Sequence, residues 1–255
     1  MLEVRRLTKR YTTVTAVNDV SFTVKPYEVL GYLGPNGSGK STTVNLITGL
    51  LEPTHGEVLF EGRSIQSQLI EYKRRLGYVP ESPHLYPYLT GREYLQLVGR
   101  LRGLVGRKLD QKADDLLELF QLGASRHSPI ASYSKGMRQK VLISSALLHN
   151  PDILVFDEPL SGLDVTSALV FRNLIKSLTR EGKIILYSSH VLEVVEKVCT
   201  HVMILRKGQV AANDTVDALR TLLKLPSLED IFSELVVDHD VETTADSIVN
   251  VMKQA

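Results

Sequence analysis

The stretch VLGYLGPNGSGKSTTVNLITGL, residues 29–50, decides the fold of this chain. An apolar run typical of a strand leads into a glycine-rich turn, and a helical pattern follows the turn. The turn, Gly34 to Ser41, matches the pattern G-x-x-x-x-G-K-[ST], whose glycines allow backbone N–H groups to surround phosphate oxygens. A chance glycine-rich turn is the alternative, and the strand before it and the helix after it argue against that alternative. The stretch therefore predicts a phosphate-binding loop and, with it, nucleotide binding.

The chemistry of such a loop assigns roles to its side chains. Lys40 is expected to contact the β- and γ-phosphates of the nucleotide, and the Ser41 hydroxyl is expected to ligate Mg²⁺. The helix N-terminus behind the loop adds partial positive charge. The residues expected to hold the phosphates are Gly34, Pro35, Asn36, Gly37, Ser38, Gly39, Lys40, Ser41 and Thr42.

The second half of the chain alternates between short apolar runs and helical patterns. The runs ILVF at 153–156 and KIILYS at 183–188 have the length of buried strands, and a helical pattern at 166–182 joins them. Alternation of this kind indicates a parallel sheet with right-handed crossovers. The other expected elements are strands at 14–24, 28–33, 57–60 and 201–206 and helices at 113–123, 137–150, 189–199 and 227–236, with Gly123 as a C-cap and Ser227 as an N-cap.

Composition excludes several classes of protein. The chain has 255 residues, of which 43% are hydrophobic, so it is neither disordered nor too short for a sizeable core. One cysteine rules out a disulfide scaffold and fits a reducing cytosol, and no apolar run is long enough to span a membrane. The 30 basic and 29 acidic residues give a net charge of +1, so no nucleic-acid partner is expected.

Two carboxylates, Asp157 and Glu158, follow the apolar run at 153–156. Open α/β sheets hold their ligands at the carboxyl ends of buried strands. Asp157 suits a Mg²⁺ ligand, and Glu158 suits a group that polarises an attacking water. Adjacent acids after a strand are more often a turn or a helix cap, and the phosphate-binding loop upstream favours the catalytic interpretation.

Further motifs occur in a fixed order along the chain. They are SKGMRQ at 134–139, SGLD at 161–164, His190 after the run KIILYSS, Tyr11 before the strand at 14–24, and LGYVPE at 76–81. Over residues 1–235 this ordered set resembles the ATP-binding subunit of an ABC transporter. The resemblance implies an α/β fold: a P-loop NTPase core with a mainly parallel sheet, an N-terminal antiparallel β subdomain and an inserted α-helical subdomain. We expect an ATPase domain at 1–225, with the insertion at about 82–135, and a helical extension and tail at 226–255.

The resemblance also implies roles for single residues. Ser134 and Gly136 would face the γ-phosphate held by a second subunit, so that two ATP molecules lie between two head-to-tail subunits. His190 would hydrogen-bond the γ-phosphate, and Tyr11 would stack on adenine. Each residue also has a simpler interpretation: Ser134 as an ordinary helix N-cap, His190 as a structural or surface histidine, and Tyr11 as a half-buried tyrosine at a strand end.

The chain departs from the family pattern at Glu81, where the family commonly carries glutamine, and at Lys135 and Met137 of the signature motif. An acidic oxygen still suits Mg²⁺, although it adds negative charge beside the triphosphate. The expected catalytic residues are therefore Lys40, Glu81, Glu158 and His190, and the expected metal ligands are Ser41, Glu81 and Asp157.

The resemblance implies partners as well as chemistry. An integral-membrane transporter subunit would dock beside Glu81 on the aromatic stretch that holds Tyr86 and Tyr88, unless these residues instead pack the insertion onto the core. The chain would then be a cytoplasmic ATPase at the inner face of the cell membrane that powers transport, in the export direction by resemblance. A soluble ABC-type ATPase acting on DNA or ribosomes, and a regulatory module with little hydrolysis, are the alternatives.

Overall fold

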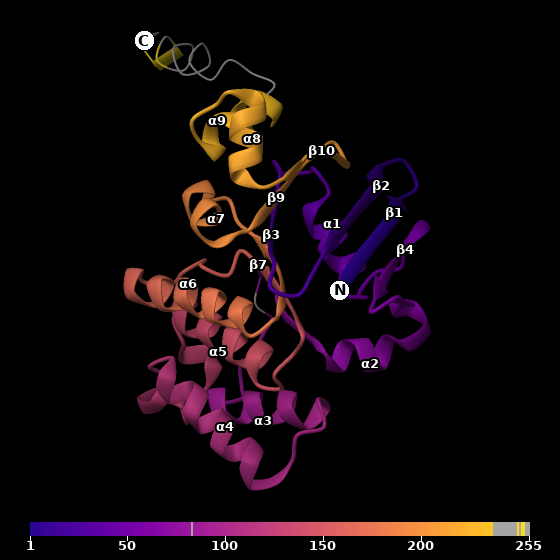
Figure 1. Cartoon of the computed structure of the whole chain (residues 1–255). Helices are drawn as coiled ribbons and strands as arrows, with labels where there is room; N and C mark the ends of the chain where they lie inside the picture. Colours follow the sequence, from indigo (N-terminus) through magenta and orange to yellow (C-terminus); the bar gives the residue numbers. More distant parts are fainter. Residues whose placement is uncertain (83, 237–248, 250, 253–255) are drawn as a thin grey trace.

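The computed structural model describes residues 1–82, 84–236, 249, 251 and 252 (Figure 1). The tail predicted at 237–255 thus lies almost wholly outside the described residues. In the described part of the chain, the strands form two sheets. No helix within these residues is long and apolar enough to cross a membrane.

The first sheet is antiparallel and has the order β2-β1-β4-β5. It confirms the N-terminal antiparallel subdomain. Its strands are β1 (Leu2–Arg10), β2 (Thr15–Val24), β4 (His55–Phe60) and β5 (Arg63–Ser64). The strand β1 was not predicted, although Leu2, Val4 and Leu7 are buried on its inner face.

The second sheet has the order β10-β9-β3-β8-β7-β6, and its pairs from β9 to β6 are parallel. Its strands are β3 (Val29–Leu33), β6 (Leu76–Val79), β7 (Ile153–Asp157), β8 (Ile184–Ser188), β9 (His201–Arg206) and β10 (Gln209–Asp214). Every residue of β3, β7 and β8 is buried, as expected for parallel strands that are covered on both faces. The mainly parallel core is therefore confirmed.

Two hydrophobic clusters cover the two faces of this sheet. One cluster joins it to the antiparallel sheet, α1 (Lys40–Ile47) and α2 (Leu69–Arg74). The other joins it to α5 (Lys135–Leu147), α6 (Val165–Arg180), α7 (Leu192–Val198), α8 (Val216–Leu223) and α9 (Leu228–Val236). Short 3₁₀ helices span Ile65–Gln68, Gly123–Ser125 and Ile130–Ser132.

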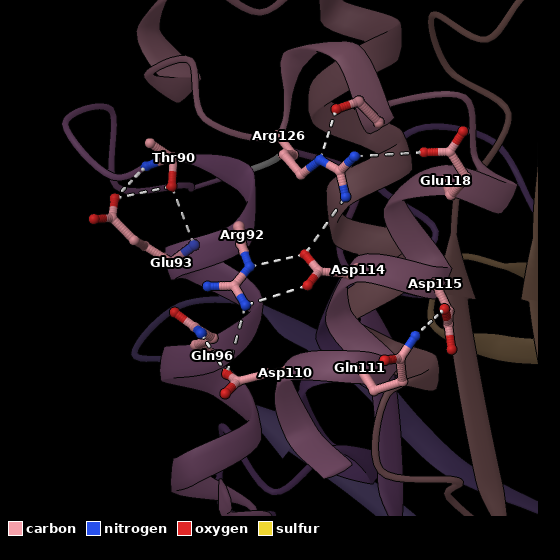
Figure 2. A network of polar contacts seen from close by, with 11 residues as sticks. Thr90, Arg92, Glu93, Gln96, Asp110, Gln111, Asp114, Asp115, Glu118 and Arg126 are labelled. Carbon is pink, nitrogen blue, oxygen red and sulfur yellow. Dashed lines mark hydrogen bonds and ion pairs between the residues drawn. The ribbon is translucent and has the colours of Figure 1, made fainter. Parts of the chain in front are cut away.

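The inserted subdomain consists of α3 (Gly91–Leu101) and α4 (Gly106–Leu119), which pack on α5 around a third cluster. Figure 2 shows the polar contacts that join α3 to α4. The Arg92 guanidinium donates to both carboxylate oxygens of Asp114, at 2.8 and 3.2 Å, and Thr90 and Glu93 form a capping box at the start of α3. The predicted helical insertion is therefore present.

The prediction that a helix over 113–123 ends on Gly123 is wrong. The helix α4 ends at Leu119, and Gln121, with φ 60°, takes the left-handed position. The N–H of Gln121 donates to Glu118 O, and the N–H of Leu122 donates to Leu117 O, which is the bonding of a Schellman motif. Because the buried side chains of Leu122 and Leu117 belong to one cluster, their packing places the cap here despite the lack of glycine.

The C-terminal helix α9 begins as predicted. The Ser227 hydroxyl accepts from the Asp230 N–H at 3.1 Å, and Leu228, Ile231 and Val236 are buried against the core that α7 and α8 share. A separate extension beginning at residue 226 stays a prediction.

Candidate functional site

The phosphate-binding loop joins β3 to α1 in a backbone conformation that requires glycine. Gly34, Gly37 and Gly39 have φ values of 155°, 78° and 104°. A Cβ atom at residue 39 would lie 2.3 Å from the carbonyl oxygen of Ala16 in β2. The glycines therefore bring the loop against the neighbouring strand and leave its N–H groups to face a ligand.

A cavity of about 160 Å³ opens in front of this loop, at the carboxyl ends of the parallel strands. It contains all four predicted catalytic residues and all three predicted metal ligands. It also contains Ser188, which sequence reasoning missed; the signal was its place at the end of a buried strand, where it pairs with Asp157. The lining residues are Asn36, Gly37, Gly39, Lys40, Ser41, Thr42, Glu81, Asp157, Glu158, Ser188 and His190.

The ammonium group of Lys40 lies across the loop. It donates to the carbonyl oxygens of Gly34 and Pro35, at 2.5 and 3.1 Å. Burial lowers the pKa of Lys40, while the nearby carboxylates of Glu158, Asp157 and Glu81 act against this shift. Its charge is therefore held by weak backbone acceptors, which a phosphate oxygen can replace.

The two carboxylates at the end of β7 have raised pKa values. Burial raises the pKa of Asp157, and burial together with the charges of Asp157 and Glu81 raises the pKa of Glu158 to about 7. The Oε1 atom of Glu158 lies 3.4 Å from Nε2 of His190. A half-protonated carboxyl near neutral pH, beside a histidine, is suited to accept a proton from water.

The cavity thus gathers three carboxylates and one lysine. Its Ser41 hydroxyl and its carboxylate oxygens are the hard donors that Mg²⁺ prefers. The Oε1 atom of Glu158 is buried and accepts no hydrogen bond from the described residues. The donor set fits a divalent cation that arrives with a phosphate ligand, and the Glu158 Oε1 beside His190 keeps its acceptor capacity for a water.

Other predicted residues lie outside this cavity. Gly34, Pro35 and Ser38 shape the loop without lining the cavity, and Ser38 is buried. Tyr11 is 47% exposed in the turn between β1 and β2, with Lys9 Nζ 5.6 Å from its ring centre. The Lys9 ammonium therefore lies over one face of the ring, and stacking of Tyr11 on adenine stays a prediction.

The signature residues also lie outside the cavity of their own chain. The Ser134 hydroxyl accepts from the Met137 N–H at 3.2 Å, so its N-cap role is confirmed. Gly136 lies against the loop between β7 and α6, where an added Cβ would be 2.5 Å from Gly162 O. One chain therefore does not bring Ser134 and Gly136 to its own phosphate-binding loop.

Comparisons with known proteins agree with this geometry. The family model described as "ABC transporter" matches residues 17–161. The ABC transporter ATP-binding protein NatA of Bacillus subtilis is 39% identical over 234 residues, which cover 91% of this chain and 95% of that protein. EcsA of the same organism, an ABC-type transporter ATP-binding protein, is 34% identical over 92% of this chain and 96% of its own.

Solved structures are similar as well. An ATP-binding subunit of an ABC transporter is 36% identical, with a TM-score of 0.87, and the match covers 92% of this chain and 99% of that one. The dimeric cassette MJ0796 bound to ADP and Pi, a post-hydrolysis state, is 27% identical with a TM-score of 0.79, over 84% and 98% of the two chains. The fold, the cavity and these relatives together establish that the chain belongs to the ABC transporter family, as an ATP-binding and ATP-hydrolysing subunit.

Proposed function

We propose that this subunit hydrolyses MgATP by in-line attack of water on the γ-phosphate, with Glu158 as the general base, and that hydrolysis powers export through a separate membrane subunit. The observation that carries the proposal is the Glu158 carboxyl, whose pKa is raised to about 7 in the cavity in front of the phosphate-binding loop. At neutral pH a large share of this group is ionised and able to take a proton from water.

The other predicted site residues bind the nucleotide and its metal ion. Lys40 exchanges its backbone acceptors for β- and γ-phosphate oxygens, and the loop N–H groups hold the same charge. Ser41, Asp157 and Glu81 would hold Mg²⁺, which neutralises phosphate charge when it is bound. His190, 3.4 Å from Glu158, orients the γ-phosphate, and Tyr11 stacks on adenine.

A second subunit completes the site in this proposal. Ser134 and Gly136 begin α5 outside the cavity of their own chain, so they are available to a γ-phosphate bound by another chain. The dimeric MJ0796 cassettes support such a pairing. An isolated chain is then a poor ATPase.

The membrane partner would dock beside Glu81. Tyr86 and Tyr88 are 61% and 91% exposed, whereas Leu85 and Tyr94 of the same stretch pack on the cores. Two exposed aromatic rings a few residues after Glu81 favour a protein partner over solvent. The subunit would therefore be held at the inner face of the membrane through that contact.

A Tyr86→Asp/Tyr88→Asp variant tests this docking and should no longer co-purify with the membrane subunit. Intact assembly together with intact membrane-linked ATPase activity would contradict the docking.

The test of the catalytic proposal is Glu158→Gln, measured in the complex purified from membranes. The variant should bind ATP, lose turnover and accumulate a closed dimer. The matched control is Glu181→Gln, which changes an exposed glutamate at the end of α6 and should keep full turnover. Full turnover in Glu158→Gln would reject Glu158 as the general base.

A further inference from the structure

The backbone at Glu158 is held in an unusual conformation. Its φ is 48°, in the left-handed region that side-chain-bearing residues seldom adopt. Two backbone hydrogen bonds restrain this residue. The Glu158 N–H donates to Ser188 O of β8 at 3.1 Å, and the Glu158 carbonyl oxygen accepts from the Ser161 N–H at 3.1 Å. Because such a conformation persists only where its surroundings enforce it, the other side of the turn must also be restrained.

Gln139 supplies a restraint on that other side. Its Nε2 atom donates to the carbonyl oxygen of Pro159, the residue after Glu158, at 3.0 Å. Gln139 is 2% exposed, and Pro159 is also buried. A buried hydrogen bond between different elements is costly to break, since the carbonyl then loses its partner where water cannot replace it.

Two further contacts join the same face of α5 to the same loop. Gly136 lies against the carbonyl of Gly162, and the Lys140 ammonium is 3.6 Å from the Asp164 carboxylate. Residues 136, 139 and 140 are three and four positions apart, so they share one face of the helix. The first turns of α5 and the loop 158–164 therefore pack as one unit, with Gln139 as its buried polar contact.

We propose that Gln139 is a positioning residue for Glu158: its amide holds Pro159 so that the Glu158 carboxylate points into the cavity. The inference rests on the proposed function, since it gives Gln139 a role in hydrolysis only through Glu158. Loss of the amide would leave the phosphate-binding loop untouched, because that loop lies between β3 and α1. The expected defect is therefore in the chemical step and not in ATP binding.

The experiment compares Gln139→Met with wild type in the complex purified from membranes. Methionine keeps the length of the side chain and removes its donor. We expect kcat to fall by roughly ten- to a hundredfold, as for a misplaced catalytic group, with KM for ATP nearly unchanged. The melting temperature should fall by only about 2–4 °C, since one buried carbonyl loses its donor. Gln111→Met, an exposed glutamine on α4, is the matched control and should equal wild type.

A double mutant separates positioning from general damage. If Gln139 acts through Glu158, then adding Gln139→Met to Glu158→Gln should not lower the residual rate further. A second variant, Gln139→Glu, regains a donor when its buried carboxyl is protonated, so its kcat relative to wild type should rise as the pH falls. The same ratio for Gln139→Met, whose side chain does not titrate, should stay constant over this pH range.

The outcomes distinguish the two proposals. Turnover retained in Glu158→Gln overturns Glu158 as the base. Arrest in Glu158→Gln together with wild-type kcat in Gln139→Met overturns only the positioning role. An equal loss from Gln139→Met in both backgrounds, or a rise in KM without a fall in kcat, also overturns it.

Discussion

Replacing Glu158 by glutamine should change the stability of the nucleotide-free protein in a pH-dependent way. Burial, with the charges of Asp157 and Glu81, raises the pKa of Glu158 from 4.5 to about 7. The folded protein therefore binds this proton more tightly than the unfolded chain does. Below about pH 4.5 both states are protonated and the carboxyl costs nothing. Above about pH 7 both are ionised, and the folded state carries the full cost of a buried charge.

The magnitude follows from the size of the shift. At 1.36 kcal/mol per pKa unit, it corresponds to about 3 kcal/mol of unfolding free energy. The Glu158 side chain is only 16% exposed, so solvent screens little of this energy. Wild-type stability should lose this amount as pH rises from about 4.5 to 7, whereas Glu158→Gln should not. The advantage of the variant should therefore grow by about 3 kcal/mol over this range.

The assay is denaturant unfolding of both proteins at several pH values between about 4 and 8, without nucleotide and with EDTA. Subtracting wild type from variant removes every titration that does not depend on the charge of Glu158. Glu181→Gln is the control and should give a pH-independent difference. A difference for Glu158→Gln that is equally flat would refute the reasoning that burial sets the state of this carboxyl.

Three other substitutions test the core, a helix start and the phosphate-binding loop. Phe156→Ala removes a buried ring whose centre lies 5.1 Å from that of Phe171. Guanidinium unfolding should show a loss of about 3–5 kcal/mol in the free energy of unfolding, and a loss below about 1 kcal/mol would contradict the packing. Thr90→Ala breaks the capping box with Glu93 and should cost about 1 kcal/mol by thermal melting, and an unchanged melting curve would show that the cap is dispensable. Gly39→Ala places a methyl group 2.3 Å from a β2 carbonyl oxygen, and calorimetry should show at least about a tenfold loss of ATP affinity; wild-type affinity would mean that the loop adapts.

The parallel core could be predicted because its strands are buried on both faces and read as plain apolar runs. The strand β1 could not be predicted in the same way, because only one of its faces is buried. Its outer face carries Glu3, Arg5 and other charged residues, and irregular register with both neighbours breaks the alternation of apolar and polar positions. Where a strand shifts register, its buried side chains no longer fall on every second residue. The two-residue alternation that predicts a half-buried strand is then lost from the sequence.

The candidate site could be predicted to the extent that each residue adjoins a motif. Asp157 follows an apolar strand and Lys40 ends a glycine-rich loop, so both were found. Ser188 has no motif of its own, and only the pairing of β7 with β8 brings it to Asp157. The role of Gln139 was equally hidden, since its hydrogen bond to Pro159 depends on how α5 packs on a distant loop.

The order of the parallel sheet has a consequence for synthesis on the ribosome. The strand β3, which carries the phosphate-binding loop, lies between β8 and β9, so Leu33 pairs with Ile204, roughly 170 positions later. At 5–20 residues per second, translation needs roughly 10–30 s to supply those partners. Until β8 is made both edges of β3 lack their neighbours, and until β9 is made one edge still does, so the nascent chain exposes an apolar strand. The cavity takes its lining from residues between Asn36 and His190, so the nucleotide site is complete only after β8 and His190 have been made, although its phosphate-binding loop is encoded near the start of the chain.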